Sequence, residues 1–325
     1  MLSAEILEAA TAWTSPRIVE WSPPLQRNLS EWLEPSIALV GDAAWGARIR
    51  DLVQLPIDDP LEWANRRITL PGGDWAIAGI RFRDRDISKP FVDIIATSLA
   101  PEPSQLAVLT DVLPHFAGFS PLCLRIHCPD PEQTRSELAR SGAYGGHATT
   151  DLLVVAGLLE TLKRRAMPST SESVDLRPGD PEAVADRVAA MYDELEHSRP
   201  GIRSWARPAD VDVLSSAAEE NLLFEVCFDS EPIGVVAAAR EDAYGMSGYS
   251  VQELCIDAEH RGRQLGSAVL LQLCGRLPIT SVGDVLWGHI HPENKPSLRN
   301  SISMGRQVVG GHLWLTPAGY PGMPA

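Results

Sequence analysis

Hydrophobic and polar positions alternate with two different periods along the second half of the chain. Short apolar runs that end in polar or glycine-containing turns predict strands at 174–178, 222–230, 232–242, 249–257, 284–291 and 307–315. Helical spacing predicts helices at 181–195, from Leu265 onward and at 295–304. Asp180 and Pro181 supply a cap and a first turn for the earliest of these helices. The second half is therefore expected to be an α/β unit.

The first half contains a weaker copy of the same pattern. Both halves follow the order strand, turn, helix, strand, helix, strand, and both pass through Gly-Gly-His into an apolar segment. Aligning Gly142 with Gly305 places Pro129 on Pro292, Asp130 on Glu293, Thr134 on Ser297 and, with one four-residue insertion, Gln105-Leu106-Ala107 on Gln264-Leu265-Gly266. A duplication explains this order better than a chance match, which is the alternative.

The length and a polar stretch in mid-chain divide the molecule. A chain of 325 residues suits two domains of roughly 150 residues each. The Ser/Thr-rich stretch at 163–173 is predicted to be a linker between domains at 1–162 and 174–325. The predicted fold class is α/β, with two tandem units that are each a mostly antiparallel mixed sheet flanked by helices.

Composition and charge narrow the functional classes. Apolar residues make up 44% and charged residues 22%, as in a soluble globular protein. A formal net charge of −15 argues against a nucleic-acid partner, which requires a basic face. No apolar run reaches the ~20 residues of a membrane span, and the N-terminus lacks the basic region of a secretory signal. The five scattered cysteines contain no Cys-x-x-Cys pair, so we expect neither disulfides nor a metal site, and a cytoplasmic location.

The stretch DAEHRGRQLGSA at 257–268 follows a predicted strand and opens a predicted helix. The free amides of a first helical turn favour an anion, Arg261 and Arg263 add positive charge, and Gly262 and Gly266 allow close approach to the backbone. A solvated basic turn before an ordinary surface helix is the equally weighted alternative. The residues alone leave the two open.

The order of elements and two motifs in the second half resemble the GNAT superfamily of N-acetyltransferases. In that family an acyl-CoA pyrophosphate loop follows Arg/Gln-x-x-Gly-x-Gly/Ala. Arg261 and Gly266 match its outer positions, whereas Gln264 stands in place of the inner glycine. Downstream, Asn294, Ser297 and Gly305 match a second motif, so that the resemblance spans about 173–317. Gln264 is expected to be tolerated if its backbone is helical.

The resemblance implies direct attack of a primary amine on acetyl-CoA, with a small-molecule or peptide acceptor. Glu253 matches the position of the family's general base. The alternative is that Glu253 is a polar residue on a solvent-exposed face of the sheet and has no catalytic role. The implied cofactor-binding residues, including an oxyanion-binding amide at Leu254 or Ile256, are Leu254, Ile256, Arg261, Gly262, Arg263, Gln264, Leu265, Gly266, Ser267, Asn294 and Ser297. A helix N-cap is the alternative role of Asn294.

Several catalytic positions are left open. The family's tyrosine acid corresponds to Ser301 here, and Tyr249 is a conceivable substitute. His289 and His291 on the neighbouring strand are alternative bases, and Arg299 faces either phosphate or solvent. Trp205, Asp210 and Asp212 are candidates for the lining of the acceptor site.

The first half differs from the second at the position of the loop. Glu102 stands where Arg261 stands in the second half, and prolines at 101 and 103 remove amide donors, so this half is expected to hold no cofactor. A non-catalytic acyl-CoA-binding or interaction protein on the same fold is the main alternative, and a nucleotide-binding loop motif is absent. A monomer or a homodimer fits the fused halves.

Overall fold

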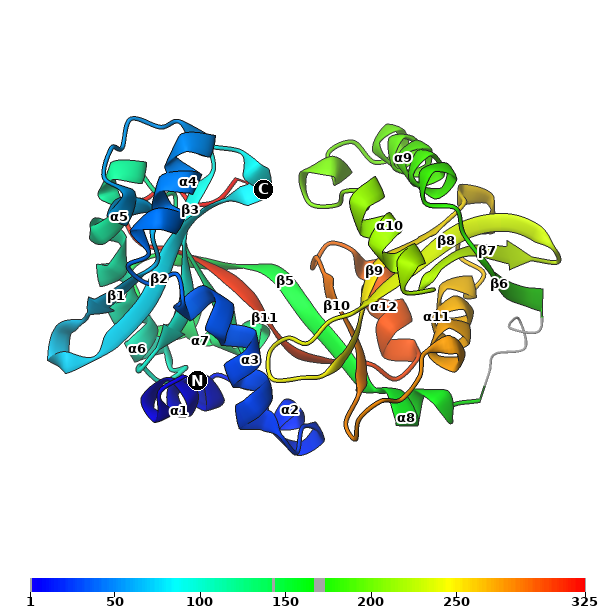
Figure 1. Cartoon of the computed structure of the whole chain (residues 1–325), viewed down its shortest axis with the longest axis horizontal. Helices are drawn as coiled ribbons and strands as arrows, with labels where there is room; N and C mark the ends of the chain where they lie inside the picture. Colours follow the sequence, from blue (N-terminus) through cyan, green and yellow to red (C-terminus); the bar gives the residue numbers. More distant parts are fainter. Residues whose placement is uncertain (1, 142–143, 167–172, 325) are drawn as a thin grey trace.

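The computed structural model describes residues 2–141, 144–166 and 173–324, and its strands form one mixed sheet (Figure 1). The strand order is β1-β2-β3-β4-β11-β5-β10-β9-β8-β7-β6. The strands are β1 (Arg66–Thr69), β2 (Trp75–Phe82), β3 (Pro90–Thr97), β4 (Leu124–Cys128), β5 (His147–Leu158), β6 (Val174–Pro178), β7 (Leu223–Phe228), β8 (Glu231–Arg240), β9 (Gly248–Ile256), β10 (Val285–Ile290) and β11 (Gln307–Thr316).

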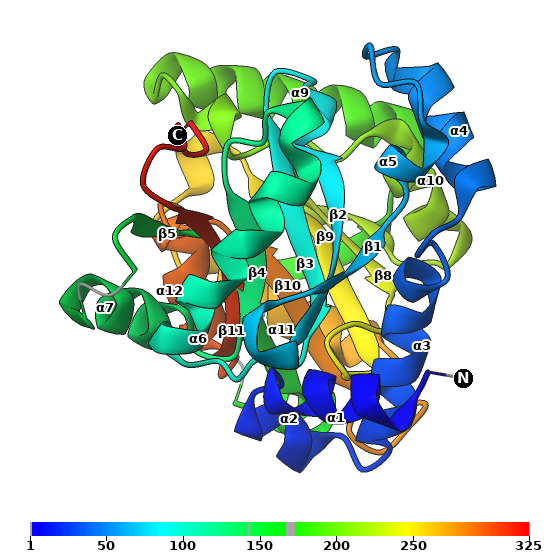
Figure 2. The ribbon, with the colours of Figure 1, turned by 90° about the vertical axis from the view of Figure 1, so that its left-hand side faces the viewer.

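Helices cover both faces of this sheet. In Figure 2, α6 and α7 lie on one side of the strands β1–β4 and α3 lies on the other. The α-helices are α1 (Ala4–Ala12), α2 (Pro16–Trp21), α3 (Leu25–Ile37), α4 (Ala43–Val53), α5 (Pro60–Trp63), α6 (Pro103–Val108), α7 (Pro131–Ser141), α8 (Leu159–Lys163), α9 (Pro181–Ser198), α10 (Val211–Glu219), α11 (Leu265–Arg276) and α12 (Lys295–Ser303). A 3₁₀ segment, η3 (Leu109–Phe119), follows α6.

The two halves exchange their last strands at the centre of the sheet. β5, the last strand of the first half, pairs with β10 of the second half, while β11, the last strand of the second half, pairs with β4 of the first. β5 and β11 also pair with each other along nearly their whole length. Figure 1 shows both strands crossing from one lobe to the other. Each half therefore contributes the strand that completes the other half's sheet.

From β3 onward in the first half and from β9 onward in the second, the elements follow the same order. A short parallel pairing joins β3 to β4 in the first half, and another joins β9 to β10 in the second. Each parallel pair is bridged by a helical connection, through α6 and η3 or through α11, as parallel strands require. The order strand, helix, strand, helix, strand that the sequence predicts is present in both halves.

The predicted elements of the second half agree with the observed ones to within a few residues at each end. The predicted linker is different, because its first residue, Lys163, ends α8, and residues 167–172 lie outside the described residues. Gly142, which anchors the alignment of the halves, also lies outside them. All five cysteines are free and buried. No helix among the described residues is long and apolar enough to cross a membrane.

The N-terminal helices, for which the sequence analysis predicts no elements, pack against the exchanged strands. Ile18, Leu25 and Leu29 share a buried cluster with residues of β5, β10 and β11. α3 also holds the β8–β9 connection, where the Asn28 side-chain amide donates to the Gly245 carbonyl (3.2 Å). Gly245 has φ +83°, and a Cβ there would meet Leu25 at 2.7 Å. Only glycine fits this left-handed, crowded position.

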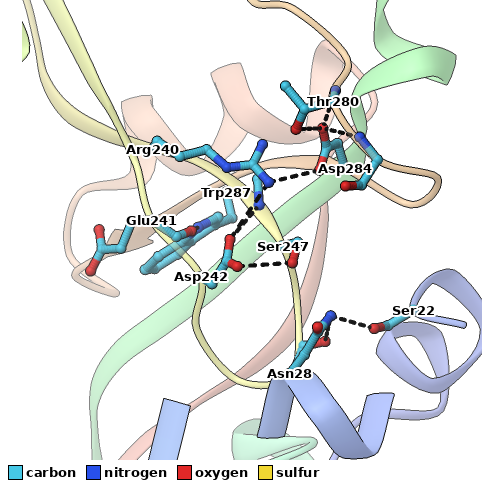
Figure 3. A network of polar contacts seen from close by, with 12 residues as sticks. Ser22, Asn28, Arg240, Glu241, Asp242, Ser247, Thr280, Asp284 and Trp287 are labelled. Carbon is cyan, nitrogen blue, oxygen red and sulfur yellow. Dashed lines mark hydrogen bonds and ion pairs between the residues drawn. The ribbon is translucent and has the colours of Figure 1, made fainter. Parts of the chain in front are cut away.

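A buried polar network fixes the start of β10 against the end of β8 (Figure 3). Arg240 donates to Asp284 (3.1 Å), whose side chain is fully buried. The other carboxylate oxygen of Asp284 accepts from the amide and hydroxyl of Thr280 and from the Ser281 amide. The Trp287 indole donates to the Glu241 carbonyl (3.0 Å). These contacts position β10 beside β9, where the two strands form the candidate site.

Candidate active site

The site begins where β9 and β10 separate. Their parallel pairing covers only Gly248–Ser250 on β9 and Val285–Trp287 on β10. Beyond that point the strands diverge around a cavity of about 220 Å³. Its lining comes from both sheet faces and both halves: Leu152, Tyr192, Trp205, Ala206, Arg207, Val251, Gln252, Glu253, Leu254, Leu270, Gly288, His289, Ile290, His291, Asn294, Ser297, Asn300, Ser301 and Arg306.

Glu253 is the buried carboxyl group of the cavity wall, with 5% of its surface exposed. Its two oxygens accept from the Ala209 amide (3.0 Å), the Leu254 amide (3.0 Å) and the Tyr192 hydroxyl (3.3 Å). Burial raises the pKa of Glu253, and the two amides and the tyrosine oppose that rise. A carboxylate that is held rigidly and ionises above its usual range has the properties of a general base.

The same contact affects the predicted oxyanion site. The Leu254 amide donates to Glu253 and so is engaged in this structure. Ile256, two residues further along β9, does not line the cavity. Its carbonyl accepts from Arg261 Nε (2.8 Å), which ties the following loop to the end of the strand.

The two histidines predicted as alternative bases also line the cavity. The ring of His291 stacks on Trp205, with centroids 4.8 Å apart. His289 Nε2 lies 2.8 Å from the Tyr244 hydroxyl. Burial lowers the pKa of His289 to about 4, with Arg125 contributing, and burial also lowers the pKa of His291. Both rings are therefore neutral at physiological pH.

The loop before α11 has an unusual backbone. Gly262 has φ +79° and Gln264 has φ +61° and ψ +16°, so both are left-handed, while Arg263 between them is not. Gln264 is therefore not helical but adopts the conformation that glycine favours, so the condition under which we expected its side chain to be tolerated is not met. The first amides of α11, from Leu265 onward, lack acceptors within the helix and are free to bind an anion.

The two loop arginines are exposed and have partners of different kinds. Arg261 donates to the Ile256 carbonyl through Nε, and Arg263 lies over the Phe228 ring, 4.7 Å from its centroid. Gly266 lies against α12, since a Cβ there would meet Asn300 Nδ2 at 2.7 Å. Ser267 is buried, and its hydroxyl donates to the Gln264 carbonyl (2.9 Å). The loop thus combines exposed amides and charges with a tightly packed first helical turn.

The N-terminus of α12 forms the adjoining wall. Asn294 is the N-cap, since its side-chain oxygen accepts from the Ser297 amide (3.3 Å), and both residues also line the cavity. The two roles that the sequence left open for Asn294 are therefore compatible. Arg299 on the same helix is exposed.

Some of the residues that the sequence places at the site are buried or lie outside the cavity. The Tyr249 ring packs in the hydrophobic core, with the Arg240 guanidinium 5.1 Å from its centroid, and it does not line the cavity. Ser301 lines the cavity but is buried, and its hydroxyl accepts from Arg306 Nη2 (2.6 Å). Asp210 caps α10, and neither it nor Asp212 reaches the cavity, unlike Trp205.

Sequence reasoning missed three polar residues of the site. Tyr192 follows the buried stripe of α9 and gives no chemical signal in the sequence. Arg207 pairs with Asp84 of the first half (3.2 Å), so a contact between the halves closes one side of the cleft. Arg306 follows the motif glycine and is an ordinary charged residue by pattern, although its side chain is almost completely buried.

The equivalent loop of the first half has a different geometry. α6 begins at Pro103, with Glu102 at the N-cap in an extended conformation and with no side-chain cap bond. Proline lacks an amide donor, and the carboxylate of Glu102 repels an anion. Among the described residues, no group of three or more His, Cys, Asp or Glu could hold a metal ion.

The sequence matches no protein-family model and no curated protein. Solved structures that resemble it include GCN5-related N-acetyltransferases. One from Sphaerobacter thermophilus is 14% identical, with 91% of this chain and 95% of that chain covered and a TM-score of 0.49. A GNAT-family acetyltransferase from Colwellia psychrerythraea is 10% identical, with 75% and 85% covered and a TM-score of 0.46. A Drosophila protein is 15% identical over 97% of both chains, with a TM-score of 0.46.

Proposed function

We propose that the chain transfers an acyl group from acetyl-CoA or a related CoA thioester to the primary amine of a small molecule or peptide. One observation carries this proposal. The cavity between the diverging strands β9 and β10 joins a buried carboxyl group, Glu253, to the N-terminal wall of α12, and a loop with two left-handed residues precedes the neighbouring α11. Acyl transfer requires these three elements, a base, a narrow thioester site and a pyrophosphate site, next to one another.

The thioester side of the site is assigned to the loop and the two helix N-termini. The left-handed residues Gly262 and Gln264 and the first amides of α11 suit the pyrophosphate, and Arg261 and Arg263 add charge. Asn294 and Ser297 line the cavity on the same side and suit the amides of the pantetheine arm. The side chain of Gln264 is exposed.

The acceptor side is assigned to the opposite face of the sheet. Glu253, Tyr192 and the stacked pair of Trp205 and His291 surround this end of the cavity. An incoming ammonium must lose a proton before it can attack, and the Glu253 carboxylate accepts it. The amine nitrogen then bonds to the carbonyl carbon, the C–S bond breaks, and the thiolate leaves with the electron pair and takes up a proton.

A steady-state assay of thiol release tests the proposal. Acetyl-CoA is incubated with a panel of primary amines and the full-length protein, and Glu253→Gln is compared with wild type. We expect turnover with at least one amine class and a loss of about 10²–10⁴-fold in kcat for Glu253→Gln, with CoA affinity retained. Equal turnover by the two proteins would contradict the assigned base.

The hydrogen bond from Leu254 to Glu253 favours a second candidate function. An amide that is already engaged does not stabilise an oxyanion until Glu253 moves, and Ser301 is likewise occupied by Arg306. A chain that binds acyl-CoA without turning it over would retain this arrangement. In the same assay, that function predicts tight acetyl-CoA binding and no thiol release with any amine.

A further inference from the structure

Arg306 is a charged side chain in the wall of the cavity without an acidic partner. It is 4% exposed and lies at the junction of α12 and β11. Its Nη2 donates to the Ser301 hydroxyl (2.6 Å), while Nε and Nη1 are buried without any hydrogen-bond partner. No salt bridge to Arg306 occurs within the part of the chain that the structure describes. The guanidinium thus retains two unpaired donors that are buried in the wall of the cavity.

The position of Arg306 is close to the point where the strands separate. Its Nη1 lies 3.6 Å from the place that a Cβ on Gly288 would occupy, and the Val251 side chain is equally close to that place. Gly288 and Val251 are the first residues beyond the parallel pairing of β10 and β9. Arg306 donates to Ser301 of α12 and interacts electrostatically with Cys274 of α11, which places it on the side of the sheet that these two helices cover.

An unpaired guanidinium in this position is costly for the protein by itself. Removing a cation from water without a counter-ion is strongly unfavourable, and burial lowers the pKa of Arg306 to about 10. The group nevertheless remains protonated at neutral pH. Carboxylates and phosphates match the fork of N–H donors of arginine, and a carboxylate is the one that an acyl group can carry to the point where the strands separate.

We propose that Arg306 binds a carboxylate carried by the acyl group, so that the preferred donor is the CoA thioester of a short dicarboxylic acid. This inference rests on the acyl transfer proposed above. The amine bonds to the thioester carbonyl carbon, the C–S bond breaks, and CoA leaves as the thiol. The distal carboxylate is unchanged and ends in an N-acyl product that carries a free acid. No oxidant or further reactant is needed.

Two matched thioesters test this assignment by calorimetric titration of the full-length protein. Succinyl-CoA and butyryl-CoA have four-carbon acyl chains and differ in the terminal carboxylate. We expect succinyl-CoA to bind at least tenfold more tightly than butyryl-CoA. In Arg306→Met, which replaces the guanidinium with a neutral chain, the preference is expected to invert, and Arg306→Lys is expected to restore part of it. Arg48→Met, on α4 far from the cavity, keeps the wild-type preference.

The outcomes separate this inference from the proposed function. Equal binding of both thioesters by wild type overturns the carboxylate assignment and leaves acyl transfer standing. Binding of neither overturns both. A third arm measures thiol release from acetyl-CoA with phenylalanine and with phenethylamine. A preference for phenylalanine that disappears in Arg306→Met, without discrimination between the thioesters, would assign the carboxylate to the acceptor and overturn the acyl assignment. Thermal unfolding of each variant confirms that it is folded.

Discussion

At the scale of single residues, Glu253 combines burial with three hydrogen bonds, which makes its protonation state the main variable of the site. The resemblance to the GNAT superfamily and the place of Glu253 just before the loop predicted this residue as a candidate base, and the structure places it in the cavity wall. Its partners could not be predicted in this way, because Tyr192 and Ala209 are brought to it by the packing of α9 and the chain before α10. A sequence pattern does not specify such contacts.

The raised pKa of Glu253 predicts a pH dependence. Because the base must be ionised, kcat/KM is expected to rise with pH through the raised pKa and to level off above it. Protonation of Glu253 also stabilises the folded state, because its pKa is higher in the folded than in the unfolded chain. The free energy of unfolding that Glu253 contributes relative to Glu253→Gln is fully present below the ordinary glutamate pKa of about 4.3 and decreases as the pH rises through the raised value. Rate profiles and denaturant titrations from pH 4 to 9 measure both effects. Parallel profiles for the two proteins would contradict the role of Glu253.

Gln264 gives a second prediction at this scale. A non-glycine residue at φ +61° is strained by about 1–2 kcal/mol, so Gln264→Gly is expected to raise the free energy of unfolding by up to about 1 kcal/mol, once the extra entropy of glycine in the unfolded chain is subtracted. Gln54 is a matched control because it has φ +59° at the end of α4. Gln54→Gly is expected to stabilise similarly. Only Gln264→Gly is expected to change acetyl-CoA affinity, which titration calorimetry measures. Destabilisation by Gln264→Gly alone would show that the side chain is required for the loop.

At the scale of elements, hydrophobic periodicity predicted β6–β11 and the helices α9, α11 and α12 of the second half. It predicted neither α1–α5 and α10 nor the tight β8–β9 connection. The N-terminal helices are short, and their burial depends on β5, β10 and β11, which lie far away in sequence. The left-handed backbone of Gln264 was also beyond prediction, since it follows from the geometry of the loop and not from the preference of the residue.

The network around Asp284 provides a prediction at this scale. Burial raises the pKa of Asp284, but Arg240 and the amides of Thr280 and Ser281 outweigh this effect, so that the pKa is lowered. Asp284→Ala leaves Arg240 without its buried partner and is expected to cost about 3–5 kcal/mol. Asp175→Ala, at an exposed ion pair with Arg177, is expected to cost about 0–1 kcal/mol.

Acidification provides an independent readout of the same network. Because the pKa of Asp284 is depressed, its stabilising contribution is present above the ordinary aspartate pKa and is lost as the pH falls through the depressed value. The gap in unfolding free energy between wild type and Asp284→Ala is therefore expected to narrow at low pH in denaturant titrations. An equal cost for Asp284→Ala and Asp175→Ala would contradict the importance of the network.

At the scale of the whole molecule, the exchanged strands β5 and β11 bind the two halves into one sheet. The repeat was visible in the sequence, but the exchange was not, because an apolar strand pattern does not specify its neighbour. Fragments 1–163 and 174–325 are therefore expected to lack cooperative unfolding when they are alone, and to form a folded one-to-one complex when they are co-expressed. Circular dichroism melting and analytical ultracentrifugation measure this. Cooperative, monomeric melting of either fragment would contradict it.

The proposed function depends on binding of the acyl-CoA pyrophosphate by the loop before α11. Titration calorimetry of the full-length protein with acetyl-CoA tests it most directly, with Arg261→Glu as the loop variant and Arg48→Glu as the same charge change at a distant exposed site. We expect saturable one-to-one binding that weakens with salt, is at least tenfold weaker in Arg261→Glu and is unaltered in Arg48→Glu. No binding by wild type, or equal affinity in all three proteins, would contradict it.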